Sequence, residues 1–359
     1  MVQKSPSNIV SLTESASLPF DCIIDVRSPL EYAHDHLPDA INLPVLSNEE
    51  RITVGTLHKQ DSAFAAKRHG AALVAANIAR HLLDTLHDKP KDWSPLIYCW
   101  RGGNRSGAFV TICEKIGWKP KQLEGGYRSY RRGVVESLGT FPTQFRYIVI
   151  CGVTGSGKSR LLRSLAQEGA QVLDLEDLAK HKGSVLGHDA TLPQPSQKMF
   201  ESLVLRALQG FDPTRPVFVE AESKKIGAVQ VPDALMQTMR AAPCIRLEAT
   251  EEQRVALLLE EYAHFLGDHP RLLKQLDCLV DLHGHAVVSR WRAQVATQDW
   301  QAHVRDLLVT HYDPAYLRGM ARNYAHYHQA QELRLTGISE DAMRRSAQDA
   351  VLTASHLRL

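Results

Sequence analysis

The feature that most constrains the fold of this chain is a glycine-rich segment of eight residues that follows an apolar run. Its residues are Gly152, Val153, Thr154, Gly155, Ser156, Gly157, Lys158 and Ser159, and they match the pattern G-x-x-x-x-G-K-[ST] in full. Residues 147–151 (YIVIC) predict a buried strand before it, and residues 160–169 predict a helix after it. A glycine-rich turn between a strand and a helix directs backbone N–H groups at phosphate. The segment therefore predicts an α/β domain that binds a β-phosphate or a diphosphate.

The same loop predicts a metal site. We expect Lys158 to reach the phosphate oxygens and the Ser159 hydroxyl to ligate Mg²⁺. Glu220 ends an apolar run, so we take it as the carboxylate that binds the metal. Asp174 ends another apolar run and remains a competitor, and Glu222 would share the face of Glu220 if that strand continued. For each carboxylate a structural salt bridge remains the alternative.

A second candidate site is a cysteine followed by glycines and arginines. The apolar residues 96–99 predict a buried strand, and a helix follows through about residue 118. Cys99 would then lie at the carboxyl end of a strand, where open α/β sheets bind their ligands. Glycines let backbone N–H groups turn toward an anion, and their field lowers the pKa of a cysteine among them. We expect Cys99 and Arg105 to be catalytic and the remaining loop residues to bind the anion: Trp100, Arg101, Gly102, Gly103, Asn104 and Ser106. A buried structural cysteine is the alternative.

Strands that alternate with helices predict two α/β domains with mostly parallel sheets. A chain of 359 residues has room for two such domains and an appended segment. A short stretch around Pro142 predicts a linker, and from Glu251 onward the sequence is helical and charged with no convincing strand. We expect α/β domains at 12–137 and 145–250 and a helical segment at 251–359.

Composition excludes several classes of protein. No apolar run approaches the ~18 residues of a membrane span, and the N-terminal residues lack the apolar core of a signal peptide. We therefore expect a cytoplasmic protein without membrane association. None of the six cysteines forms a C-x-x-C pair, which argues against a zinc site or a disulfide framework. The net charge of +2 neither requires nor excludes nucleic acid as a partner.

Basic residues gather after the cysteine loop. The window 101–132 holds eight Lys and Arg residues, only two acidic residues, and the aromatic residues Tyr127 and Tyr130. Basic and aromatic side chains together suit contact with RNA phosphates and stacking on bases. Candidate RNA contacts are Arg128, Arg131 and Arg132; an ordinary solvated surface is the alternative.

Residues 12–137 resemble the rhodanese family. The resemblance is carried by the cysteine loop, by Asp25-Val-Arg27 and His36-Leu-Pro38, and by the segment 123–127 (LEGGY). It implies a rhodanese-like α/β domain that carries sulfur or a related chalcogen on the loop cysteine. We expect Asp25, Arg27 and His36 to have structural rather than catalytic roles. Five residues separate Cys99 from Arg105, where simple rhodaneses have four, so the loop should hold a larger or tetrahedral anion such as a phosphate or selenophosphate.

The rhodanese loop followed by the phosphate loop resembles the bacterial tRNA 2-selenouridine synthase family. Further matching segments are 47–56, 173–176, 194–197 and 220–227. The resemblance implies a transferase that acts on a wobble 2-thiouridine of tRNA in two steps. Geranyl diphosphate first S-geranylates the base, and selenium from selenophosphate, carried on Cys99 as an S-selanylcysteine, then displaces the geranylthio group.

The resemblance assigns each anion to one loop. The phosphate loop would bind the diphosphate leaving group, and the cysteine loop would bind selenophosphate. We expect a monomer rather than an oligomer. Three alternatives remain: an ATP-dependent tRNA sulfurtransferase, a small-molecule kinase with a regulatory rhodanese module, and an RNA-binding protein with two vestigial loops.

Overall fold

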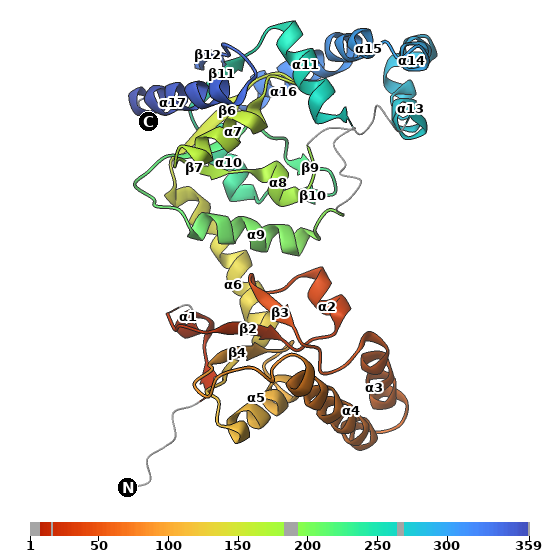
Figure 1. Ribbon diagram of the computed structural model, residues 1–359, viewed down its shortest axis with the longest axis vertical. Helices are drawn as coiled ribbons and strands as arrows, with labels where there is room; N and C mark the ends of the chain where they lie inside the picture. Colours follow the sequence, from red (N-terminus) through yellow and green to blue (C-terminus); the bar gives the residue numbers. More distant parts are fainter. Residues whose placement is uncertain (1–7, 16, 183–192, 264–268, 358–359) are drawn as a thin grey trace. The chain divides into compact units, whose positions relative to one another are not determined.

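The computed structural model describes residues 8–15, 17–182, 193–263 and 269–357. The chain divides into two compact units. The first combines Met1–Ser137 with Pro195–Arg206, and the second combines Leu138–Gln194 with Ala207–Leu359. Each unit contains a five-stranded sheet (Figure 1). The expected α/β fold with parallel sheets is thereby confirmed.

The sheet of the first unit has the strand order β1-β5-β4-β2-β3, and every neighbouring pair is parallel. Its strands are β1 (Ile9–Val10), β2 (Cys22–Asp25), β3 (Ala40–Asn42), β4 (Pro95–Tyr98) and β5 (Lys121–Leu123). Its helices are α1 (Leu12–Ser15), α2 (Pro29–His34), α3 (Asn48–Gln60), α4 (Ala63–Asp84), α5 (Asn104–Ile116) and α6 (Gly126–Thr140).

The central strand β4 is buried along its whole length, because helices cover both faces of a parallel sheet. Successive side chains point to opposite faces. Ile97 and Cys99 therefore join the core cluster that contains Phe109 of α5. Leu96 and Tyr98 join the cluster on the other face. The chain leaves this buried strand directly into the cysteine loop.

A segment from the middle of the sequence completes the first unit. Residues 195–206 include most of helix α9 (Gln197–Gln209). The Ser202 hydroxyl donates to Oδ1 of Asp35 over 2.9 Å. Asp35 is completely buried, and a buried carboxylate is costly unless its oxygens accept hydrogen bonds. The segment 195–206 therefore supplies a hydrogen bond to Asp35, a carboxylate that the N-terminal part of the chain buries.

The sheet of the second unit has the parallel strand order β12-β11-β6-β8-β7. Its strands are β6 (Tyr147–Cys151), β7 (Gln171–Leu173), β8 (Val217–Glu220), β11 (Cys244–Glu248) and β12 (Gln331–Arg334), and β9 (Lys225–Ile226) pairs with β10 (Val229–Gln230) as a separate ribbon. Its helices next to the sheet are α7 (Lys158–Gln167), α8 (Leu175–Ala179), α10 (Asp233–Ala241) and α17 (Glu340–His356).

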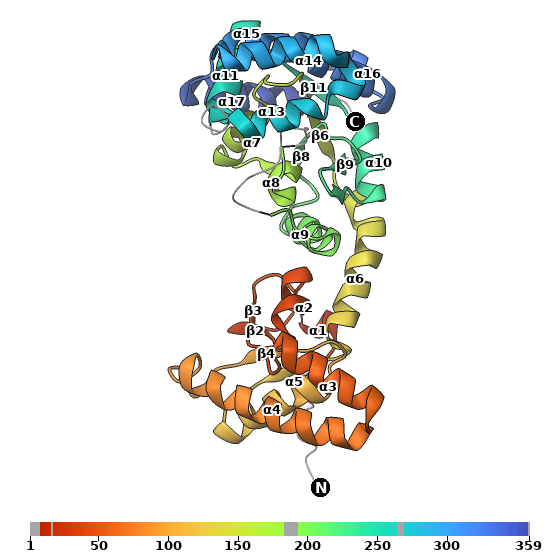
Figure 2. The ribbon, with the colours of Figure 1, turned by 90° about the vertical axis from the view of Figure 1, so that its right-hand side faces the viewer.

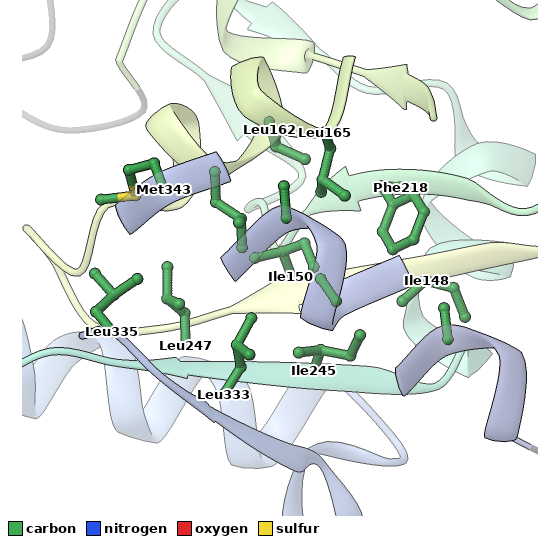
Figure 3. Packing of buried hydrophobic residues seen from close by; sticks show 14 of the residues in the cluster. Ile148, Ile150, Leu162, Leu165, Phe218, Ile245, Leu247, Leu333, Leu335 and Met343 are labelled. Atoms are coloured by element: carbon green, nitrogen blue, oxygen red, sulfur yellow. The ribbon is translucent and has the colours of Figure 1, made fainter. Parts of the chain in front are cut away.

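Strand β12 corrects the expectation that no strand follows residue 251. It lies at the edge of the sheet beside β11, and Leu333 is its one buried residue. An edge strand exposed to water has no continuous apolar run, so its sequence (QELR) gives no strand signal. Figure 3 shows Leu333, Leu335 and Met343 packed with Ile150 and Leu165 in one core. The end of the chain is thus part of the α/β core of this unit.

Further helices of the second unit lie between β11 and β12 in the chain, and three of them share a core of their own. They are α11 (Glu251–Glu261), α13 (His269–Asp277), α14 (Val280–Ala296), α15 (Trp300–Leu307) and α16 (Asp313–Asn323). Helices α13, α14 and α15 lie beside one another (Figure 2). Their apolar side chains pack around Trp291, which is completely buried. The helical segment that the sequence predicts is confirmed here. No described helix is both long and apolar enough to cross a membrane.

The stretch around Pro142, where we predicted a linker, is helical. Helix α6 ends at Thr140, and a 3-10 turn follows at Phe141–Gln144 with Pro142 buried within it. Proline is tolerated in the first turn of a helix because the missing N–H has no partner to lose there. The break between the two predicted domains is therefore helical.

Candidate functional site

The cysteine loop connects β4 to α5. Helix α5 begins at Asn104, directly after Gly103. Gly102 has a φ of 63°, and a Cβ there would lie 2.4 Å from the Leu123 carbonyl oxygen. The Tyr127 N–H donates to the Cys99 carbonyl oxygen over 2.8 Å. The segment 123–127 therefore holds the loop in place from behind, and only glycine fits at the point of closest approach.

The Cys99 thiol is 3% exposed and accepts hydrogen bonds inside the loop. The Ser106 hydroxyl lies 3.2 Å from Sγ, and the Gly103 N–H donates over 3.4 Å. Burial alone would raise the pKa of this thiol. The hydrogen bonds from Ser106 and Gly103, together with the charge of Arg105, outweigh burial and lower the pKa below its usual value. The loop thus favours the thiolate that a nucleophilic cysteine requires.

Arg105 does not stand free beside the thiol. Its Nη1 lies 3.0 Å from Oε2 of Glu31, which also receives Arg51 over 2.9 Å. Burial would raise the pKa of Glu31, but Arg105 and Arg51 lower it. The sequence did not identify Glu31, which lies in a helix some seventy residues before the loop. One carboxylate shared by two arginines leaves a net positive charge at this edge of the loop.

The other loop residues differ in exposure. Arg101 and Asn104 are exposed, and Ser106 is completely buried against the thiol. Trp100 packs on Tyr127 with the ring centroids 5.3 Å apart. The structure therefore brings Ser106 and the Gly103 backbone to the sulfur and leaves Arg101 and Asn104 at the surface.

A buried ion pair positions the residues behind the loop. Arg27 is 1% exposed, and its Nη2 lies 2.6 Å from Oδ2 of Asp25. The guanidinium of Arg27 also lies over the ring of Tyr127, 4.0 Å from its centroid. The Tyr127 hydroxyl donates to Asp35 over 2.7 Å. His36 stacks on a neighbouring tyrosine ring at 3.8 Å. These contacts are the structural roles expected for Asp25, Arg27 and His36.

The phosphate loop has the expected strand–loop–helix context. It leaves β6 and opens α7 at Lys158. Gly155 and Gly157 have φ values of 77° and 88°, and a Cβ at Gly155 would lie 3.1 Å from the Arg254 carbonyl oxygen. Lys158 Nζ donates to the Gly152 carbonyl oxygen over 2.8 Å. The Lys158 ammonium group therefore lies across its own loop, and a bound phosphate group would compete with the Gly152 carbonyl oxygen for it.

Three carboxylates meet beside this loop. Oxygen atoms of Glu176, Glu220 and Glu222 lie within 4.8 Å of one another. Glu220 is 1% exposed, and its Oε1 has no hydrogen-bond partner among the described residues. Burial, reinforced by mutual repulsion, raises the pKa of Glu176 to about 7 and that of Glu222 to about 8, and it raises that of Glu220 well above its usual value. Three carboxylates without enough neighbouring positive charge to balance them suit a divalent cation, which prefers oxygen ligands.

The predicted metal residues Ser159 and Glu220 both lie at this cluster, and a third residue joins them. The Ser159 hydroxyl donates to Oε2 of Glu176 over 3.2 Å. Glu176 lies in the first turn of α8, two residues after the competing candidate Asp174, and was not among the expected metal residues. Asp174, the competing candidate, caps α8 by accepting from the Asp177 N–H over 2.8 Å. Asp174 is therefore occupied by a structural role.

The C-terminal helices support the phosphate loop directly. The Tyr316 hydroxyl of α16 accepts from the Gly152 N–H over 2.7 Å. Arg254 donates to the Thr154 carbonyl oxygen over 2.9 Å and pairs with Asp313 at 2.5 Å. The sequence assigned no role to these residues, because they lie about 100 to 160 positions from the loop they hold.

The candidate tRNA contacts do not share one environment. Arg128 and Arg132 are exposed on α6. Arg131 is partly buried and pairs with Glu201 of α9 within the first unit. Arg131 therefore has an internal partner, and two of the three arginines remain available at the surface.

Known proteins match both units. Residues 145–271 match the family model described as the tRNA 2-selenouridine synthase AAA domain, and residues 11–132 match the model of the rhodanese-like domain. A tRNA 2-selenouridine synthase of Nitrosomonas europaea is 35% identical over 247 residues, which cover 67% of this chain and 63% of that protein. Among solved structures, a rhodanese-related protein of Thermoplasma volcanium is 17% identical with a TM-score of 0.22, and it covers 34% of this chain and 90% of that chain.

One relative aligns with this chain across both units. A tRNA 2-selenouridine synthase of Shewanella denitrificans is 32% identical over 342 residues. The alignment covers 86% of this chain and 91% of that protein, so it includes both loops and most of the C-terminal helices. The order of the two domain matches along the chain agrees with this alignment. The chain belongs to the tRNA 2-selenouridine synthase family.

Proposed function

We propose that this chain is a tRNA-modifying transferase that converts a wobble 2-thiouridine to 2-selenouridine through an S-geranylated intermediate. One observation carries the proposal: a single chain holds a cysteine poised as thiolate in an anion loop and a separate diphosphate loop beside a carboxylate cluster. The relatives named above support tRNA as the substrate. A two-step reaction that consumes two different anions needs two such loops.

The cysteine loop would perform the selenium step. Cys99 would carry selenium from selenophosphate as an S-selanylcysteine; a small-molecule disulfide would accept the two electrons as the S–Se bond forms, and water would release the phosphate. The terminal selenium would then bond to C2 of the base as the geranylthiolate leaves, and the thiols formed from the disulfide would reduce the S–Se bond and free both Cys99 and 2-selenouridine. Ser106 and the Gly103 N–H support the nucleophile because both hydrogen-bond Sγ. Arg105 adds positive charge for the anionic donor while Glu31 fixes its orientation.

The phosphate loop would perform the geranyl step. Its backbone and Lys158 would bind the diphosphate of geranyl diphosphate and stabilise the charge that grows as this group leaves. The residues fit Mg²⁺, since Glu220 has a buried oxygen without a partner and Glu176 and Ser159 lie beside it. When bound, the metal would neutralise diphosphate charge. Tyr316 and Arg254 would keep the loop closed around the ligand.

The test is mass spectrometry of wobble nucleosides from cells that carry single variants. Lys158→Ala should stop the pathway at 2-thiouridine, because loss of a donor to developing charge costs on the order of 3–4 kcal/mol. Cys99→Ala should instead accumulate the geranylated nucleoside. Lys274→Ala and Cys113→Ala are the matched controls: Lys274 is exposed outside the loop, and burial raises the pKa of the Cys113 thiol to about 12.

The outcomes separate the competing functions. Retention of 2-selenouridine in the Cys99→Ala strain would exclude the proposed selenium carrier. Loss of 2-thiouridine itself in cells without the protein would favour a sulfurtransferase. Phosphorylation of a small molecule that persists without Cys99 would favour the kinase. A geranylated product in Lys158→Ala would show that the loops are assigned to the wrong steps.

A further inference from the structure

A pocket of about 420 Å³ opens beside the cysteine loop within the first unit. Trp100, the residue after Cys99, forms part of its wall together with Tyr127. Leu30 and Ile52 also line it, and they are 68% and 65% exposed. Large apolar side chains at such exposure beside a reactive loop form a surface on which a flat or apolar group can lie.

Positive charge lies on the same pocket. Arg51 and Lys198 line it, and Glu31 is the carboxylate in the lining. Because Glu31 is shared by Arg51 and Arg105, it does not neutralise the group. Lys198 comes from the segment 195–206 that completes the first unit. The lining therefore combines an aromatic wall with a net positive charge.

We propose that this pocket receives the target nucleotide of the tRNA, with its base against Trp100 and its flanking phosphates at Lys198 and Arg51. Single-stranded RNA is recognised by bases that stack on aromatic rings and by cations that follow the backbone. A base held on Trp100 would lie next to the residue that carries the reactive sulfur. The inference rests on the proposed function and adds the site at which the nucleotide is presented.

The experiment measures binding of a wobble 2-thiouridine anticodon stem-loop to the full-length protein by fluorescence anisotropy at several salt concentrations. Trp100→Ala should weaken binding roughly tenfold, the loss expected for one stacked base. Lys198→Glu should weaken binding. It should also reduce the slope of log Kd against log salt concentration by about 1, the change expected for the loss of one phosphate contact. Phe64→Ala and Lys91→Glu are matched controls, because both residues are exposed and neither lines the pocket.

A second RNA, abasic at the wobble position, separates stacking from charge. The Trp100→Ala effect should disappear with this RNA, whereas the Lys198→Glu effect should persist. An equal Trp100→Ala effect on both RNAs would overturn the placement of the base. Lys198 does not pack in the core, so its variant tests the pocket even if Trp100→Ala unfolds.

The assay also distinguishes this inference from the proposed function. If both pocket variants bind both RNAs as the wild type does while the wild type still forms 2-selenouridine, the pocket assignment is wrong and the function stands. If the wild type neither binds the stem-loop nor modifies tRNA, the function is wrong and the pocket assignment falls with it.

Discussion

The hydrogen bond from Ser106 to Cys99 gives a quantitative prediction about the nucleophile. In Ser106→Ala, Sγ loses the hydroxyl at 3.2 Å and keeps the Gly103 N–H at 3.4 Å. A hydrogen bond to a charged group contributes ~1.5–3 kcal/mol, so the thiolate population at neutral pH should fall at least about tenfold. The fold should survive, because Gln122 retains the Gly102 and Gly103 carbonyl oxygens as acceptors.

The assay is the pH dependence of Cys99 alkylation by iodoacetamide, quantified by peptide mass spectrometry because Cys278 is exposed and also reacts. A lowered pKa means that the wild-type thiol reacts at lower pH than an ordinary thiol, and Ser106→Ala should move the profile to higher pH. Thr111→Ala is the matched control, since this hydroxyl on the same helix bonds only the Gly107 carbonyl oxygen among the described residues. Identical profiles for Ser106→Ala and the wild type would refute the reasoning.

Three further predictions concern the loop and the helical cluster. Arg105→Lys keeps the positive charge but loses the forked geometry of the guanidinium. The variant should therefore form less 2-selenouridine than the wild type when wobble nucleosides are measured by mass spectrometry. A wild-type amount of 2-selenouridine would contradict this prediction. Gly126→Ala should lower the free energy of unfolding in urea by more than ~1 kcal/mol, because φ is 55° and a Cβ would lie 2.2 Å from the Cys99 carbonyl oxygen; Gly139→Ala, with open space around it, should be tolerated. Burial lowers the pKa of His303 to about 4 in the folded state. As the pH falls below 6.5, His303 therefore binds a proton in the unfolded state but not in the folded state. Stability should therefore drop by about 3 kcal/mol between pH 6.5 and 4, and His303→Leu should remove that drop in acid-unfolding curves.

The sequence predicted both loops because each is a local pattern. Gly157, Lys158 and Ser159 follow a strand and open a helix within a few residues, and Cys99 likewise follows a buried strand. Short segments of this kind specify their own backbone, and the parallel sheet then places both at carboxyl ends of strands. The α/β class of both units followed from the same alternation.

Long-range partners could not be predicted in this way. Glu176 reaches Ser159 only because α8 starts directly after β7. Arg131 looks like a free cation in the sequence, and its partner Glu201 lies 70 positions later. Strand β12 is polar because it lies at an edge, so periodicity does not reveal it. In each case the contact partner is set by tertiary packing, and no local sequence pattern identifies that partner.

The segment 195–206 has a consequence for folding during synthesis. About 70 residues separate Ser137 from the end of this segment. At ~5–20 residues per second, a ribosome needs roughly 4–14 s to supply them. Until then Asp35 and Arg131 lack Ser202 and Glu201. The N-terminal unit should therefore emerge as an incomplete intermediate, exposed to chaperones and proteases, and reach its final stability only after the first part of the second unit, Leu138–Gln194, and the segment 195–206 have been translated.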